Sequence, residues 1–378
     1  MSLKILHLIA GLSVGGAEHQ LSYLVREQSQ RGYEVVVAHL LENDDPELWG
    51  KAQSCLHHIN AAGNYDPRII AKTIKLIRRF KPDIIHSWIL PMDIVGGIAA
   101  RFTNTPWVVR ESTSMGNYEF ADWPSRIKRW LQKTIISMAS LIVSNSNSGN
   151  DYWASVYPDK RRCVIRNALP LEKIRKTSPI TIGQSGIPQE RDFILYAGRL
   201  ENWPKNLYRL FEAFREVVRI TNVDVVICGE GADRKNLEQI AIDSGFADRF
   251  HFTGYINNVW QYMKAAKLFC SISLVEGQPN TVLEAMANGC PVVVSDIPAH
   301  REFINADMAY FVNPEDTADI QENILAALSS AAEANIKALK SYNYANSLDV
   351  SAMADAYENA YERLLKEFTM EAKPHAKQ

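Results

Sequence analysis

Short apolar segments alternate with longer amphipathic ones along most of this chain, and this alternation constrains its fold more than any other feature. Near-continuous runs of Val, Ile and Leu are typical of strands that are covered on both faces. In the first part of the chain we expect strands at 5–9, 34–40, 83–86, 107–110, 141–144 and 164–165. Helical spacing falls between them, at 17–31, 68–80, 93–103, 125–139 and 147–156. Strict alternation of strand and helix predicts an α/β fold with a parallel, doubly wound sheet.

A second alternation follows a stretch of different composition. Residues 170–192 hold three prolines and two glycines with little apolar periodicity, so we predict a linker at 171–192. Beyond it, strands are expected at 193–197, 224–228, 250–253, 268–272 and 291–294, and helices at 206–220, 233–244, 259–266, 281–288 and 317–333. The prediction is therefore two tandem Rossmann-like domains, 1–170 and 193–350, which face each other across a cleft and bind ligands beyond the carboxyl ends of their strands.

The last amphipathic run, 351–368, has apolar residues at helical spacing on one face. We expect this helix to pack back on the first domain.

Composition excludes several classes of protein. Hydrophobic residues make up 47% and charged residues 22%, as in ordinary globular chains. The net charge of -2 provides no overall basic field for nucleic acid. No apolar run reaches the roughly 18 residues of a membrane-spanning helix. The five cysteines are odd in number and form no CxxC, which favours buried thiols in a reducing compartment. We therefore expect a cytoplasmic protein.

The stretch from Ser271 to Gly289 carries the strongest local pattern, SISLVEGQPNTVLEAMANG. An apolar strand runs into a tight turn, and a helix begins near Thr281. The free N–H groups and partial positive charge of a helix N-terminus suit a diphosphate. Two structural alternatives stay open here. Glu276 is also compatible with a solvated loop carboxylate, and Glu284 with a capping box built on Thr281.

This stretch resembles the signature of retaining glycosyltransferases of the GT-B fold, glycosyltransferase family 4 (glycosyl transferases group 1), and the resemblance covers nearly the whole chain. It implies that Glu276 contacts hydroxyls of the donor sugar and that Glu284 binds the nucleotide ribose. It also implies that the turn and first helical residues hold the distal phosphate through Gly277, Asn280, Thr281 and Val282.

Three further segments of the second domain resemble family motifs. Gly198-Arg199-Leu200 followed by Lys205 implies that Arg199 and Lys205 bind the donor diphosphate, where two cations stabilise the departing nucleotide. The alternative is that both are ordinary loop cations. The segments around Gly229 and Tyr255 resemble those beside the nucleotide, with a turn glycine and a core aromatic as alternatives. No Asp-x-Asp occurs in the chain, so the resemblance implies a metal-independent enzyme without a cofactor.

The first domain carries weaker motifs. Gly15 and Gly16 follow the first strand without forming GxGxxG, and they allow close backbone approach to a ligand. The resemblance implies that this loop faces the donor phosphates and the acceptor. The alternative role of the segment is structural: the Glu18 carboxylate stabilises the N-terminus of the following helix through its dipole. Many relatives carry a histidine where this chain has Arg110-Glu111, so Glu111 becomes the local catalytic candidate. His86 either contacts the acceptor or satisfies backbone groups.

The first 170 residues hold about 20 Lys and Arg against about 15 Asp and Glu. Within them, 125–139 is a basic, Trp-bearing amphipathic segment, which is compatible with contact with an anionic membrane or with a solvated basic face. The expected partners are a nucleotide-sugar donor and a glycan or polyprenyl lipid-linked acceptor, with no nucleic acid. If the first of these alternatives for the segment holds, the protein contacts the inner face of the membrane peripherally through it.

Taken together, these motifs predict a retaining glycosyltransferase that moves a sugar from a UDP- or GDP-sugar to an acceptor hydroxyl in surface polysaccharide or lipopolysaccharide synthesis. Two alternatives remain. One is a nucleotide-sugar 2-epimerase of the same fold, and the other is a non-catalytic nucleotide-sugar-binding subunit of a transferase complex.

Overall fold

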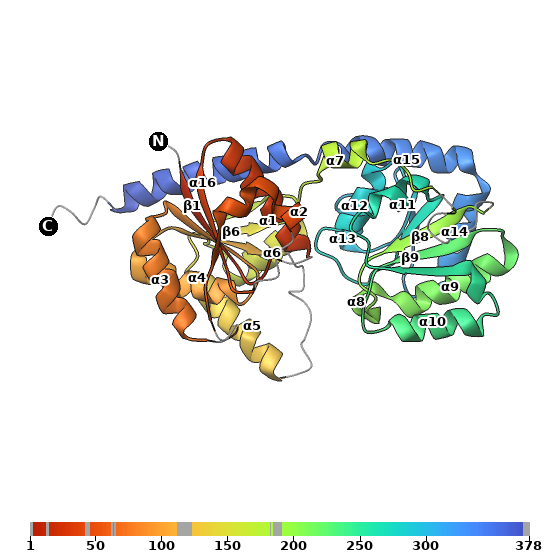
Figure 1. The fold of residues 1–378 in the computed structure, drawn as a ribbon, viewed down its shortest axis with the longest axis horizontal. Coiled ribbons are helices and arrows are strands. Elements are labelled where there is room, and N and C mark those ends of the chain that lie inside the picture. The colour runs from red at the N-terminus through yellow and green to blue at the C-terminus, as the bar shows by residue number, and fades with distance from the viewer. Residues whose placement is uncertain are drawn as a thin grey trace. The chain divides into compact units, whose positions relative to one another are not determined.

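The computed structural model describes residues 3–12, 15–41, 46–61, 63, 66–111, 123–181, 183 and 191–372. The chain divides into two compact units. Unit 1 comprises residues 1–168 and 350–378, and unit 2 comprises residues 169–349. Each unit holds one parallel sheet with helices on both faces, which is the doubly wound α/β architecture predicted from the alternation (Figure 1).

The sheet of unit 1 has the strand order β3-β2-β1-β4-β5-β6-β7. Its strands are β1 Lys4–Ile9, β2 Glu34–His39, β3 Leu56–His58, β4 Ile84–Trp88, β5 Trp107–Glu111, β6 Leu141–Ser144 and β7 Arg162–Val164. Its helices are α1 Gly16–Gln30, α2 Pro46–Trp49, η1 Gly50–Cys55, α3 Arg68–Phe80, α4 Met92–Thr103, α5 Trp123–Ile136, α6 Asn147–Val156 and α16 Val350–Ala372. Strand β3 was not predicted, because a three-residue edge strand with two histidines has no apolar run.

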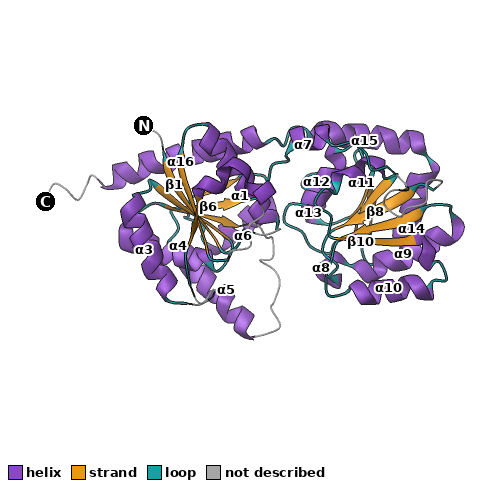
Figure 2. Cartoon of the chain, viewed as in Figure 1, coloured by secondary structure: helices purple, strands orange, loops and turns teal. Residues whose placement is uncertain are grey.

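Helix α16 closes the core of unit 1, although it follows unit 2 in the chain. Met353, Tyr357, Tyr361 and Leu364 are buried in the same cluster as α1 and one face of the sheet. The opposite face of the sheet is covered by α3, α4 and α5, which Figure 2 shows beside its strands. Within the described residues, no helix combines the length and apolarity needed to cross a membrane.

The sheet of unit 2 has the order β10-β9-β8-β11-β12-β13. Its strands are β8 Phe193–Ala197, β9 Asp224–Cys228, β10 Phe250–Gly254, β11 Leu268–Ser271, β12 Val292–Ser295 and β13 Tyr310–Val312. Its helices are α7 Leu171–Lys176, α8 Asn202–Lys205, α9 Leu207–Ile220, α10 Arg234–Asp243, η3 Ala247–Arg249, α11 Trp260–Ala265, α12 Asn280–Ala287, α13 Pro298–Arg301, α14 Thr317–Ser329 and α15 Ala331–Ala345. Helices α9, α10 and α14 cover one face, and α7, α11 and α12 cover the other.

Two segments that the sequence predicted in unit 2 have a different structure. The helix expected at 317–333 is two helices, because the Ser330 side chain caps α15 and ends the first helical run. The linker expected at 171–192 begins instead with α7, whose Leu171 and Ile174 are buried in the core of unit 2. Apolar residues three positions apart give α7 one buried face, so these residues belong to the domain rather than to a linker.

Candidate active site

Lys205 and Glu276, two donor-site candidates of unit 2, meet at the carboxyl ends of the neighbouring strands β8 and β11. The loop after β8 carries Lys205, and the loop after β11 carries Glu276. Lys205 Nζ lies 2.6 Å from Glu276 Oε1, and their side chains are only 21% and 16% exposed. The Ser273 hydroxyl donates to the same carboxylate oxygen at 2.7 Å. Glu276 is therefore a positioned, partly buried carboxylate, and the solvated-loop alternative is wrong.

Backbone and amide contacts fix the Lys205 loop. Asn206 adopts the left-handed conformation (φ 57°), and its side chain donates to the Pro314 carbonyl at 2.7 Å. The N–H of Leu274 donates to the Pro204 carbonyl at 2.9 Å, which ties the Lys205 loop to the Glu276 loop. The ion pair is thus held by two loops that the sheet brings together.

Arg199 contrasts with Lys205. Its side chain is 74% exposed, and its guanidinium lies 3.6 Å from the Glu201 carboxylate. An exposed pair of this kind contributes little to stability. Arg199 therefore presents a solvent-accessible cation beside the partly buried Lys205 loop.

Helix α12 begins at Asn280, and no side chain caps its N-terminus. The N–H of Asn280 donates to the Gln278 carbonyl at 2.9 Å, and the N–H of Leu283 donates to the Pro279 carbonyl at 3.0 Å. Among the residues described, the N–H groups of Thr281 and Val282 have no acceptor. They are the donors that an anion at this helix end would use.

Glu284 lies one turn into α12 and does not complete a capping box, so that alternative is wrong. Its Oε2 accepts a hydrogen bond from the Trp260 indole N–H at 3.2 Å. Burial raises the pKa of Glu284 to about 7, and the indole hydrogen bond opposes that rise. The sequence pattern favoured the box because Thr281 and Glu284 have the right spacing, but the N-cap residue is Pro279, two residues before Thr281.

Gly229 has a structural reason for being glycine. Its φ is +146°, and a Cβ atom there would lie 1.9 Å from the Gly198 carbonyl oxygen. The loops after β8 and β9 therefore approach each other through backbone alone. Tyr255 follows β10 and is 51% exposed, so it is not a core aromatic. Gly277 is partly buried between Glu276 and α12.

The glycine pair of unit 1 precedes and opens α1. Gly15 is the extended N-cap residue, and a Cβ atom there would lie 2.2 Å from Glu18 Oε2. The Glu18 carboxyl therefore folds over Gly15 in the first helical turn, as the helix-dipole alternative expects. Burial raises the pKa of Glu18. Ser13 and Val14, in the same loop, lie outside the described residues.

Glu111 and Arg110, the residues that replace the family histidine, are both buried. Glu111 ends β5, is 5% exposed and accepts a hydrogen bond from Gln132 Nε2 at 2.7 Å. Arg110 donates to Tyr357 and Asn167, and its guanidinium lies 4.9 Å from the Trp88 ring. Arg110 therefore anchors α16 to the sheet.

His86 also bonds to α16. Its Nδ1 lies 2.7 Å from the Tyr361 hydroxyl, and the residue is fully buried. Burial holds the pKa of His86 well below its usual value. The polar partner of His86 is thus a side chain of α16 rather than backbone.

Three residues of this region were missed by sequence reasoning: Ser273, Trp260 and His300, which is buried in α13 just after β12. Ser273 and His300 follow buried strands at their carboxyl ends, and that position is the signal that would have found them. Trp260 gave no such signal, because it lies within helix α11 and reaches Glu284 only through the packing of α11 against α12.

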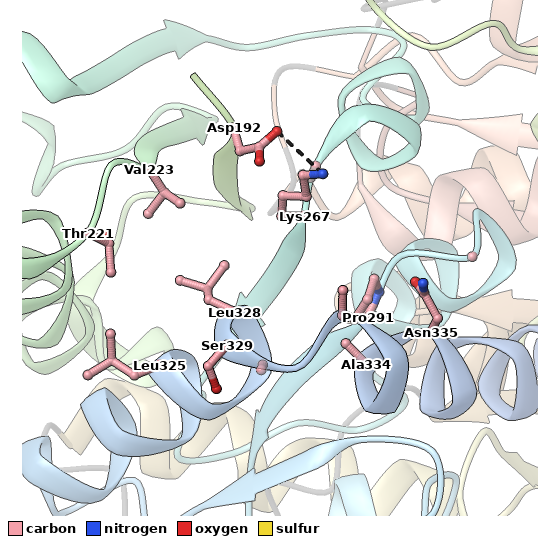
Figure 3. Close-up of a pocket in the computed structure, with 14 residues that line it drawn as sticks. Asp192, Thr221, Val223, Lys267, Pro291, Leu325, Leu328, Ser329, Ala334 and Asn335 are labelled. Atoms are coloured by element: carbon pink, nitrogen blue, oxygen red, sulfur yellow. Dashed lines mark ion pairs between the residues drawn. The ribbon is translucent and has the colours of Figure 1, made fainter. Parts of the chain in front are cut away.

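A cavity of about 630 Å³ lies elsewhere in unit 2 (Figure 3). Asp192, Val223, Lys267 and Pro291 line it, and each immediately precedes a strand. The cavity is therefore at the amino ends of the strands, opposite the edge that carries Lys205 and Glu276.

Comparison with known proteins places these features in a family. The family model described as "Glycosyltransferase Family 4" matches residues 14–173, and the model described as "Glycosyl transferases group 1" matches residues 178–345. A relative from Escherichia coli, the UDP-Gal:alpha-D-GlcNAc-diphosphoundecaprenol alpha-1,3-galactosyltransferase, is 25% identical over 78% of this chain and 79% of its own. The capsular polysaccharide biosynthesis glycosyltransferase CapH of Staphylococcus aureus is 24% identical over 79% of this chain and 83% of its own.

Solved structures share the fold. Anabaena HepE in complex with UDP-glucose matches with a TM-score of 0.82 at 20% identity, covering 96% of this chain and all of HepE. Sucrose-phosphate synthase from Thermosynechococcus elongatus matches with a TM-score of 0.81 at 18% identity, covering 97% of this chain and all of the enzyme. The two adjoining family models and the shared GT-B fold lead to one conclusion: this chain is a glycosyltransferase of family 4, group 1.

Proposed function

We propose that this glycosyltransferase moves a sugar from a UDP-sugar to a hydroxyl of a lipid-linked or glycan acceptor, with retention at the anomeric carbon and without a metal ion. The observation that carries the proposal is the meeting of Lys205 and Glu276 at 2.6 Å, at the carboxyl edge of the unit 2 sheet. Lys205, whose charge suits a diphosphate, and Glu276, whose carboxylate can accept hydrogen bonds from sugar hydroxyls, are thus held side by side. HepE binds UDP-glucose in its solved structure, and the E. coli relative is a UDP-galactose-dependent transferase. Both similarities favour uracil as the donor base.

In the proposed reaction, the acceptor oxygen forms a bond to the anomeric carbon as the bond from that carbon to the diphosphate oxygen breaks. The hydroxyl proton passes to the departing phosphate, so no covalent enzyme intermediate is required. Charge grows on the leaving diphosphate, and Lys205, Arg199 and the N–H groups of Thr281 and Val282 supply positive potential for it. Glu284 would accept hydrogen bonds from the ribose hydroxyls.

The acceptor assignments in unit 1 are proposals of the same kind. Gly15 and Gly16 would allow a ligand to approach the backbone at the start of α1. Glu111 would act on the acceptor only if its bond to Gln132 opens, so Glu111→Gln should lower transfer without changing UDP affinity. An unchanged rate of transfer for this variant would remove Glu111 from the mechanism.

We also propose that helix α5 contacts an anionic membrane that carries the acceptor. Ile127, Trp130 and Leu131 form one exposed face, with exposed fractions of 44%, 63% and 38%, and Arg126 is exposed beside them. An apolar stripe with flanking basic residues suits an anionic bilayer that carries the acceptor. Flotation with phosphatidylglycerol vesicles tests this. Trp130→Glu should abolish binding, and equal binding of both proteins would exclude α5 as the contact.

The first experiment is a thermal-shift panel of UDP, GDP and ADP in the presence of EDTA. A ligand that binds only the folded protein raises its melting temperature. A selective rise with UDP is expected, and no rise with any nucleotide would contradict the donor-site assignment. The product of UDP-sugar transfer, read by its anomeric proton coupling in NMR, then tests retention. An inverted anomer, or epimerised free nucleotide sugar, would refute the mechanism.

A further inference from the structure

A histidine that no part of the proposed mechanism uses lies at the same sheet edge. His300 is in α13, just after β12, and is fully buried. Its Nδ1 lies 2.8 Å from the Ser295 carbonyl oxygen. Because a carbonyl only accepts, Nδ1 carries the proton. Burial lowers the pKa of His300, so the ring is neutral near pH 7 and its Nε2 bears a lone pair.

That lone pair is buried and has no hydrogen-bond donor in the described part of the chain. A buried acceptor without a partner is costly, and an aliphatic side chain of similar size would avoid the cost. Packing alone therefore does not account for a histidine here. What an aliphatic side chain could not supply is the hydrogen bond from Nδ1 to the Ser295 carbonyl.

A chain of hydrogen bonds leads from the ring to the donor site. The Ser295 backbone accepts from His300, and the Ser295 hydroxyl donates to the Ser273 carbonyl at 2.5 Å. The Ser273 hydroxyl then donates to Glu276 Oε1 at 2.7 Å. Glu276 raises and Lys205 lowers the pKa of His300, so both charges act on the ring.

We infer that His300 is a positioning residue for the glycosyl donor site, which holds the Glu276 carboxylate in its working orientation through Ser295 and Ser273. The inference rests on the proposed function, because it takes Glu276 as the group that contacts the donor sugar. His300 itself touches neither the nucleotide nor the sugar in this scheme. Its loss should therefore affect the sugar-dependent steps and spare nucleotide binding.

The test compares His300→Leu with His300→Asn, whose side-chain amide can still donate to the Ser295 carbonyl. The readouts are kcat/KM for release of UDP from UDP-galactose and the Kd for UDP alone. His300→Leu should lower kcat/KM by about ten- to 100-fold, as expected when a catalytic group is misplaced. The Kd for UDP should stay within about twofold of the parent value. His300→Asn should recover most of the lost rate.

A double variant separates positioning from a general structural role. If His300 acts through Glu276, His300→Leu in a Glu276→Gln background should cause little further loss. Additive losses, or equal weakening of UDP binding and turnover, would overturn the inference. If His300→Leu does not fold, Ser295→Ala carries the test, because it removes the hydroxyl that lies 3.1 Å from His300 Nδ1 and donates to the Ser273 carbonyl. Full activity of Glu276→Gln would refute the proposed function itself, whereas an impaired Glu276→Gln beside a fully active His300→Leu would refute this inference alone.

Discussion

Replacing Glu276 by Gln should tighten the binding of UDP while it reduces sugar transfer. Glu276 Oε1 lies 2.6 Å from Lys205 Nζ and, under the proposed function, would compete with the donor diphosphate for that cation. A glutamine keeps the size of the side chain and removes its charge. Hydrogen bonds to charged groups are worth about 1.5–3 kcal/mol, and the amide oxygen retains part of that contact with Lys205. A net gain of about 1 kcal/mol remains, which corresponds to about a fivefold lower Kd for UDP.

Isothermal titration with UDP at about 0.15 M salt measures this change, because distant surface charges are screened at that ionic strength. Glu238→Gln is the matched control: it makes the same charge change on α10, at a residue paired with Arg234. The control should bind UDP as the parent does. An unchanged or weaker affinity in Glu276→Gln would show that Lys205 does not hold the diphosphate, and the reasoning would fail.

Three further predictions follow from buried groups and a close backbone contact. Burial lowers the pKa of His7 to about 4, so protons bind the unfolded chain preferentially below about pH 6.5. His7 should therefore account for about 3 kcal/mol of stability lost between pH 6.5 and pH 4 in urea unfolding, and this contribution should be absent from a folded His7→Gln variant, which keeps the pH dependence of its other buried groups. Because the pKa of Glu284 is about 7, UDP should bind more tightly as pH rises from 6 to 8, and Glu284→Gln should reduce that slope in titration calorimetry. Gly229→Ala places a methyl group 1.9 Å from the Gly198 carbonyl oxygen, so it should destabilise the protein by about 1–3 kcal/mol and weaken UDP binding, and an unchanged melting temperature would contradict the close approach.

Most of the fold was predictable because both sheets are covered on two faces. Buried strands such as β8 and β9 need unbroken apolar runs, and their predicted bounds match those observed. The edge strands β3 and β13 were missed because β3 has no apolar run and the apolar residues of β13 number only three. The linker prediction was partly wrong because it rested on Pro and Gly content, whereas the two apolar residues of α7 decide where that helix packs.

The candidate site was only partly predictable. Strand ends and the helix start near Thr281 could be read from local pattern, and they place Glu276 and Lys205 at one edge of the sheet. The pairing of these two side chains joins loops 71 residues apart, which no local pattern specifies. The hydrogen bond from Trp260 to Glu284 likewise depends on how α11 packs against α12.

The return of α16 to unit 1 sets an order of assembly during synthesis. Tyr357 and Tyr361 fill the core of unit 1, yet the ribosome adds them only after every residue of unit 2. Domains generally fold as they are completed. Unit 2 can therefore complete its core first. Until α16 has been synthesised, the face of the unit 1 sheet that α16 covers stays exposed. Unit 1, which begins at the N-terminus, therefore completes its core after unit 2. Because unit 1 consists of two separate stretches of the chain, one cut in the chain cannot separate it from unit 2.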